Sequence, residues 1–194
     1  MKRTLLMLSI IAGFGLAASD ARDQSKPAAA PAQTKPDPAA APAGPIIVLE
    51  TAKGTIEFET YPQEAPKTVA RIIELARKGF YNGLRFHRAD PGFVIQVGDP
   101  KTRDMSLRDY WGGTGSGTPL GVSEISKKRL HGRGAVAMAH SGSAKDADSQ
   151  FYITLRAAPE LNGKHAVFGR VIKGLDVAAQ IKRTDVLKKV SVRE

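Results

Sequence analysis

The chain has 194 residues, no cysteine and a formal net charge of +10 at pH 7. This length needs only one globular domain. The lack of cysteine excludes thiol catalysis and cysteine-ligated metal sites, but it decides little about the compartment, because an exported domain of this size does not need disulfides.

Residues 1–21 have the layout of a secretory signal peptide. Lys2 and Arg3 precede an apolar run at 5–18, and small residues follow up to Ala21. The alternative is an uncleaved membrane anchor, but the run is shorter than the roughly 20 apolar residues of a spanning helix. We expect cleavage after Ser19 or Ala21, and export of the protein to the periplasm.

Residues 22–45 are rich in alanine and proline and hold almost no large apolar side chain. Such a segment cannot bury a core, and it predicts a disordered, semi-extended linker. A docking motif for a proline-binding partner is the alternative. The folded domain is therefore expected at 46–194.

The first elements of this domain are a hairpin and a helix. Residues 46–51 and 55–60 read as two strands, and Lys53-Gly54 forms the turn between them. A helix is predicted over 65–78, because apolar residues recur at helical spacing, Pro66 suits its first position and Gly79 its end.

The rest of the domain reads mostly as short strands. After a long glycine-rich loop at 99–121, strands are expected at 134–139, 149–155, 167–172 and 185–192, with a short helix at 175–181. Many short strands with two helices predict a mostly β fold, an antiparallel barrel or a sandwich.

The block Phe-His-Arg-Ala-Asp-Pro-Gly-Phe-Val-Ile-Gln-Val-Gly-Asp-Pro at 86–100 brings a guanidinium, an aromatic ring and an amide together around a Pro-Gly turn. Period-two alternation predicts that Phe86 and Arg88 share one face of a strand and that His87 lies on the other. Taken alone, Arg88 fits a functional residue and a rim arginine in a salt bridge equally well.

Two later blocks also combine polar and aromatic side chains. In 149–153, alternation places Gln150 and Tyr152 on one face and Phe151 and Ile153 on the other, so that one pair lines a groove and the other fills the core. The block 161–169 is a tight turn that enters a strand. A lone histidine there, His165, is more often structural.

Other chemistries find little support. The histidines at 87, 131, 140 and 165 show no zinc-ligand spacing, the glycines at 113–117 lack the ending of a P-loop, and His140-Ser141 lacks the third group of a hydrolase triad. No metal or cofactor is expected. Nucleic acid is not expected as a partner, because no basic helix interleaved with aromatic residues is present.

The three blocks, in this order, resemble those of the cyclophilins, the peptidyl-prolyl cis/trans isomerases, and are most similar to single-domain bacterial members. The predicted helix 65–78 and the turn at 81–83 also match, so the resemblance covers essentially the whole of 46–194. It implies an eight-stranded antiparallel closed barrel capped by two α-helices, in agreement with the strand pattern.

The resemblance also implies roles for single residues. Arg88 matches the catalytic arginine, and Gln96 the glutamine that supports it. The proline pocket matches Phe93, Tyr152 and Leu161, with Val94 and Met138 beside them. The backbone segment that pairs with substrate matches Ala139 and His140. The groove wall matches Gln150 and His165.

Three positions depart from the family pattern. Tyr152 stands where many members have Phe, and its hydroxyl then needs a partner. His140 stands where many have Asn. Glu160 stands where cyclosporin-sensitive members carry Trp, which puts tight cyclosporin binding in doubt but not catalysis.

The implied function is acceleration of rotation about X-Pro peptide bonds in Pro-containing polypeptides, assisting the folding of exported proteins. The alternative is a non-catalytic binding module or chaperone for extended Pro-containing segments. Residues 46–194 carry 24 basic and 16 acidic side chains, a net charge of +8, which favours weak association with an anionic envelope surface. A monomer is expected.

Overall fold

The computed structural model describes residues 44–194. The predicted signal peptide at 1–21, and all of the predicted linker except its last two residues, lie outside the described residues. Those two residues are bonded to the domain: the backbone N–H of Gly44 donates to the carbonyl of Thr60 (2.8 Å), and the Thr60 hydroxyl donates to the carbonyl of Pro45 (2.7 Å).

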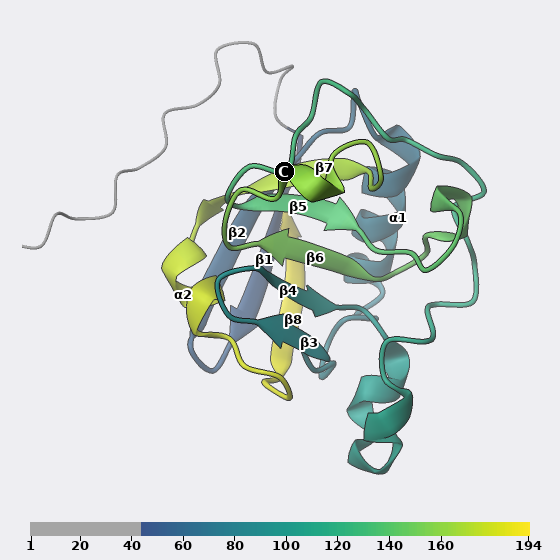
Figure 1. Cartoon of the computed structure of the whole chain (residues 1–194). Helices are drawn as coiled ribbons and strands as arrows, with labels where there is room; N and C mark the ends of the chain where they lie inside the picture. The colour runs from purple at the N-terminus through teal and green to yellow at the C-terminus, as the bar shows by residue number, and fades with distance from the viewer. Residues whose placement is uncertain (1–43) are drawn as a thin grey trace, which may run out of the picture. The chain divides into compact units, whose positions relative to one another are not determined.

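The domain is built on one antiparallel sheet of eight strands (Figure 1). Their order across the sheet is β3-β4-β6-β5-β7-β2-β1-β8. The strands are β1 (Ile46–Thr51), β2 (Gly54–Thr60), β3 (Arg88–Asp90), β4 (Val94–Val97), β5 (Ala135–Met138), β6 (Phe151–Thr154), β7 (Val167–Lys173) and β8 (Leu187–Arg193).

The two edges of the sheet meet just before β3 and β8. Arg85 and Val186 form an antiparallel bridge, the Phe86 N–H donates to the carbonyl of Asp185 (3.0 Å), and the Leu187 N–H donates to that of Leu84 (2.7 Å). These bonds join the outermost strands, so the predicted eight-stranded barrel is confirmed.

Two α-helices, α1 (Pro66–Arg77) and α2 (Leu175–Gln180), lie on opposite sides of the sheet in Figure 1. Helix α1 begins at Pro66, as predicted, and buries one apolar face that includes Val69, Ile72 and Leu75. Gly79 follows it with a φ of 68°, which suits a residue without Cβ. Neither helix in residues 44–194 is long and apolar enough to cross a membrane.

Four short 3-10 helices lie in the connections, where only loops and turns were predicted. They are η1 (Pro100–Arg103), η2 (Met105–Tyr110), η3 (Ala144–Asp146) and η4 (Pro159–Leu161). Figure 1 shows η1 and η2 projecting from the sheet as one arm. A helix this short has no amphipathic repeat, which is why sequence periodicity does not reveal it.

The buried apolar residues form two clusters. The larger is the main core, which contains Phe58, Phe86, Phe151 and Ile153 and the buried face of α1. The smaller cluster is built around Val94, Ala137 and Tyr152, with Phe93, Ala139 and Leu161 packed against it. Alternation along β6 separates the two clusters, because Phe151 and Ile153 belong to the main core whereas Tyr152 belongs to the smaller one.

Phe86 and Arg88 do not share a face, and the alternation predicted for this stretch is wrong. Phe86 is 1% exposed in the main core, whereas Arg88 is exposed at the start of β3. The backbone bends at His87, between the bridge residue Arg85 and β3. Period-two geometry holds only along a continuous strand, so the bend removes it here.

Candidate functional site

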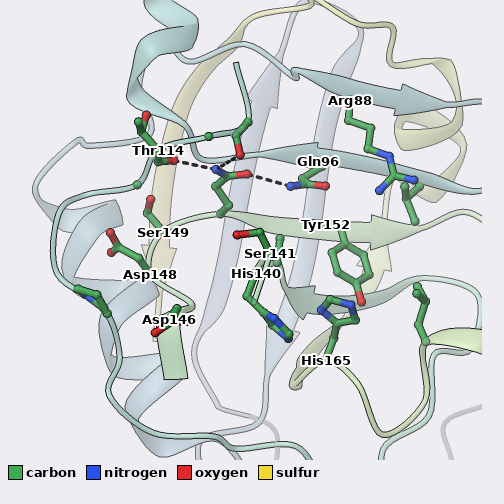
Figure 2. A pocket seen from close by; sticks show the side chains of 18 of the residues that line it. Arg88, Gln96, Thr114, His140, Ser141, Asp146, Asp148, Ser149, Tyr152 and His165 are labelled. Carbon is green, nitrogen blue, oxygen red and sulfur yellow. Dashed lines mark hydrogen bonds between the residues drawn. The ribbon is translucent and has the colours of Figure 1, made fainter. Parts of the chain in front are cut away.

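A groove of about 610 Å³ runs along the surface formed by β3, β4, β6 and the end of β5, and the loops 112–119 and 139–149 form its other wall. Figure 2 shows its side chains from close by. The predicted site residues that line it are Arg88, Phe93, Val94, Gln96, Ala139, His140, Gln150, Tyr152, Leu161 and His165.

Met138 is the one predicted site residue that does not line this groove, and its predicted place beside the pocket is wrong. Its side chain is 1% exposed and packs in the main core. Along β5, Val136 and Met138 face that core, whereas Ala135 and Ala137 face the smaller cluster. Met138 contributes only its carbonyl, which lies 3.1 Å from Nδ1 of His165.

Arg88 is held at the groove by Asp90, two residues along β3. The Arg88 Nε donates to Oδ2 of Asp90 at 2.8 Å, and Nη2 lies 2.7 Å from the same oxygen. A guanidinium has five N–H donors, so this contact fixes its plane and leaves other donors for a ligand. The Arg88 carbon Cζ lies 5.5 Å from the centre of the Phe93 ring, within the range of a cation–π contact.

Gln96 stands directly opposite Arg88 in the register of β3 and β4. Its Nε2 donates to Oε1 of Gln150 at 2.8 Å, and Gln150 in turn donates to the carbonyls of Gly112 (3.0 Å) and Thr114 (2.7 Å). In Figure 2 the amide oxygen of Gln96 points to the side of Arg88. The two amides therefore tie the strand face to the glycine-rich loop, while Asp90 holds the guanidinium.

Below the apolar part of the groove lies a buried series of hydrogen-bonded polar side chains. The Tyr152 hydroxyl is 2.9 Å from Nε2 of His131, and Nδ1 of His131 is 3.1 Å from Oδ1 of Asn162. The backbone N–H of His131 also donates to Oδ1 of Asn162 (2.8 Å), which identifies that atom as the amide oxygen. The proton of neutral His131 is therefore on Nδ1, and Nε2 accepts from Tyr152.

These hydrogen-bonded side chains are poorly solvated, which shifts the pKa values of the titratable groups among them and beside them. Burial raises the pKa of Tyr152 well above its ordinary value and lowers that of His131. Burial, and next the neighbouring His140, lower the pKa of His165. Each of these groups is thereby held neutral near pH 7. The floor of the groove is therefore uncharged near pH 7.

A second arginine also contacts the aromatic ring of the site. The Arg156 Cζ lies 4.7 Å from the centre of the Phe93 ring, and Arg156 forms an ion pair with Glu160 at 2.6 Å. Glu160, at the position where cyclosporin-sensitive relatives carry tryptophan, thus belongs to an exposed ion pair beside the pocket.

Sequence reasoning missed four residues that shape this site: Asp90, His131, Arg156 and Asn162. Asp90 carried a local signal, since residues i and i+2 of a strand share a face. His131 and Asn162 are 31 residues apart, and Arg156 lies far along the chain from the Phe93 ring, so only the fold brings these groups together at the groove.

The described residues 44–194 hold no group of three or more His, Asp or Glu side chains that could bind a metal ion. Both ring nitrogens of His140 contact backbone carbonyls, so His140 is not placed as a base for Ser141. What the groove offers is a fixed guanidinium, an apolar pocket and amide groups along its wall.

Comparison with known proteins agrees with this geometry. Residues 46–194 match the family described as cyclophilin type peptidyl-prolyl cis-trans isomerase/CLD. The chain is 45% identical over 141 residues to peptidyl-prolyl cis-trans isomerase B of Bacillus subtilis, covering 71% of this chain and 90% of that protein. It is 40% identical over 140 residues to a probable peptidyl-prolyl cis-trans isomerase of Brucella abortus, covering 71% of each.

A solved structure is similar as well. The crystal structure of a cyclophilin type peptidyl-prolyl cis-trans isomerase of Cryptosporidium parvum has a TM-score of 0.67 and 26% identity, over 77% of this chain and 98% of that one. The same protein was also solved in the presence of the dipeptide Ala-Pro, with a TM-score of 0.66.

Proposed function

This chain belongs to the cyclophilin-type peptidyl-prolyl cis-trans isomerases, and we propose that it uses Arg88 to accelerate isomerisation and that its clients are exported proteins. Peptidyl-prolyl isomerase activity on Pro-containing polypeptides follows from the family. The roles of single residues and the identity of the clients are the proposal. The observation that carries it is the Arg88 guanidinium, fixed by Asp90 at the groove beside the Phe93 ring.

The reaction is a rotation and needs no bond to break. Amide resonance sets a barrier of ~18–20 kcal/mol to this rotation. An X-Pro bond populates both isomers because its trans preference is only about 0.5–1 kcal/mol. A catalyst must therefore bind the twisted amide better than either planar form.

Arg88 supplies that preference. As the amide twists, the proline nitrogen becomes pyramidal and gains a lone pair, whereas the nitrogen of a planar amide accepts hydrogen bonds poorly. A guanidinium N–H beside that nitrogen stabilises the twisted form by electrostatics, with no proton transfer and no covalent intermediate. Asp90 fixes the guanidinium in advance, so little reorganisation is needed when the amide twists.

The rest of the groove holds the chain on the two sides of the rotating bond. Phe93, Val94, Tyr152 and Leu161 enclose the proline ring. The Ala139–His140 backbone binds the chain on the other side, and Gln96 and Gln150 keep the strand face and the loop wall together. One end of the client is anchored while the other turns.

The activity of Arg88→Ala tests this mechanism. We would follow cis-to-trans relaxation of an Ala-Pro peptide with the purified full chain, comparing wild type, Arg88→Ala and Arg77→Ala. Arg77, the last residue of α1, is a matched control, because it is an exposed arginine that forms an ion pair with Glu194. We expect kcat/KM of Arg88→Ala to fall roughly 10²- to 10³-fold, the usual loss when one such donor is removed, and Arg77→Ala to keep wild-type turnover.

Near-wild-type turnover by a folded Arg88→Ala chain would refute the role of the guanidinium. A fall in turnover with unchanged affinity for the peptide would separate catalysis from binding. If the folded wild type binds the peptide without accelerating its relaxation, the groove is a binding module.

Export is proposed from residues 1–21, whose sequence has the layout of a signal peptide. We propose a monomer in the periplasm, whose net charge of +8 over 46–194 gives weak, salt-sensitive association with anionic surfaces. Cell fractionation with N-terminal sequencing of the exported chain tests this. An intact N-terminus in the cytoplasmic fraction would overturn it.

A further inference from the structure

The His140 ring lies between two backbone carbonyls. Its Nδ1 is 3.0 Å from the carbonyl oxygen of Gly142, and its Nε2 is 2.9 Å from that of Lys164. A carbonyl oxygen can only accept a hydrogen bond. Both contacts are therefore hydrogen bonds only when both ring nitrogens carry a proton, that is, when the ring is an imidazolium.

We propose that His140 is a positioning residue whose protonated ring braces the groove wall, so that affinity for a Pro-containing chain depends on pH. The proposal rests on the proposed function, in which the Ala139–His140 backbone binds the client. It adds a role for the side chain, which replaces the asparagine found in many relatives.

The brace joins the two segments that border the pocket. The carbonyl of Gly142 belongs to the loop that follows Ala139, and that of Lys164 belongs to the turn between Leu161 and His165. Figure 2 shows the rings of His140 and His165 next to each other at this border. His140 itself lies on that loop, so its bond to Gly142 fixes the ring within the loop and its bond to Lys164 ties the loop to the turn.

Loss of one proton removes half of the brace. A neutral imidazole has one donor nitrogen, so the other nitrogen would direct its lone pair at a carbonyl lone pair. One of the two contacts must then open, and the backbone that binds the client is no longer held by both bonds. The brace therefore depends on the protonation of the ring, which makes it sensitive to pH.

Several titratable groups lie around the His140 ring. The centres of the His140 and His165 rings are 4.5 Å apart, and His165 Nδ1 lies 3.1 Å from the Met138 carbonyl. Burial and the charge of His140 both lower the pKa of His165, so His165 stays neutral beside an imidazolium. The other titratable groups on the packed segments are Lys164 on the turn, Asp146 and Asp148 farther along the loop that carries His140, and His131 behind Tyr152.

The charges of these neighbours have opposite effects on a positive charge at the His140 ring. The Lys164 ammonium opposes a second cation on the same turn, whereas the carboxylates of Asp146 and Asp148 line the same groove and favour one. A variant that removes the Lys164 side chain keeps its carbonyl, and thus keeps the brace. This makes Lys164→Met the matched control for His140.

The protonation state can be tested without any activity. We would record the ¹⁵N shifts of the histidine side chains of the full chain from about pH 5.5 to 8.0, the range in which histidine titrates. At the acid end we expect both nitrogens of His140 to be protonated, while His131 and His165 keep a single proton on Nδ1. A folded chain in which His140 carries one proton at the acid end would overturn the brace.

Affinity for the Ala-Pro peptide tests the consequence. We expect the wild type and Lys164→Met to bind the peptide roughly 3- to 10-fold more tightly at the acid end than at the basic end, the net effect of about one hydrogen bond. His140→Asn should lose this ratio, because an amide does not titrate. A wild-type ratio in His140→Asn would overturn the proposal. Bound peptide without turnover would instead count against the proposed mechanism at Arg88.

Discussion

The two faces of β6 divide the tasks of the domain between them. Phe151 and Ile153 are 1% exposed and face the main core, where the Phe151 ring packs 5.9 Å from that of Phe58. Gln150 and Tyr152 face the groove, and each ends in a hydrogen bond, to the glycine-rich loop and to His131. One strand thus contributes apolar packing on one side and directed polar groups on the other.

This difference implies that substitutions on the two faces should affect different properties of the protein. On the inner face the loss should appear in the free energy of unfolding, since buried apolar area and close packing dominate there. On the outer face it should appear in binding or turnover, while the fold survives.

Truncation of Phe151 should give the largest effect. We expect Phe151→Ala to lower the free energy of unfolding by about 3–5 kcal/mol, because it opens a cavity among rings that pack edge to face. Urea unfolding of the full chain measures this. A loss below about 1 kcal/mol, the range of conservative core changes, would show that the inner face can collapse around the gap.

Removal of the Asp90 charge should reduce turnover and leave stability nearly unchanged. We expect Asp90→Asn to lower kcat/KM about tenfold, because the Arg88 guanidinium loses the carboxylate that fixes its plane. The free energy of unfolding should change by less than about 1 kcal/mol, since the pair is exposed. Glu74→Gln, which removes an exposed carboxylate of α1 that is bonded to Lys78, is the control. Equal activity of the two variants would mean that Arg88 needs no such support.

Sequence alternation predicted the site where the strand is regular and failed where it is not. The division of Gln150 and Tyr152 from Phe151 and Ile153 was predicted correctly, because β6 runs without a bend. At 86–88 the same rule was wrong, because the backbone bends at His87 and turns Phe86 into the core. A local bend leaves no mark in a pattern of polar and apolar residues.

The resemblance to relatives predicted the barrel, the two helices and most of the groove, but it misplaced Met138. Alternation along β5 would have corrected this, since Met138 and Ala139 are adjacent and face opposite sides of an extended chain. The hydrogen bond from Tyr152 to His131 could not be predicted from the sequence. Its partners lie 21 residues apart, and they meet because His131 lies just before β5, the strand that pairs with β6.

Loss of the Tyr152 hydroxyl should have a modest effect. We expect Tyr152→Phe to lower the free energy of unfolding by about 1–2 kcal/mol, because Nε2 of the buried His131 loses its partner. Peptide affinity should change little, since the ring still forms the pocket. The double variant with His131→Phe should recover part of the loss, and no recovery would mean that the hydrogen bond is not its source.

The smallest effect concerns pH. Burial lowers the pKa values of His87, His131 and His165, so the unfolded chain binds more protons than the folded one in mildly acid solution. Stability should therefore be complete above the ordinary histidine pKa of about 6.5 and fall as the pH decreases below it. Neither ring nitrogen of His87 has a partner with good hydrogen-bond geometry among residues 44–194, although the nearby Gln150 favours the charged form. His87→Leu should thus keep near-wild-type stability at pH 7 and show a shallower decrease in acid, measured as the melting temperature from about pH 7.5 to 5.5. A decrease as steep as that of wild type would assign the proton uptake to the groove histidines alone. His87 would then contribute nothing to the loss of stability in acid.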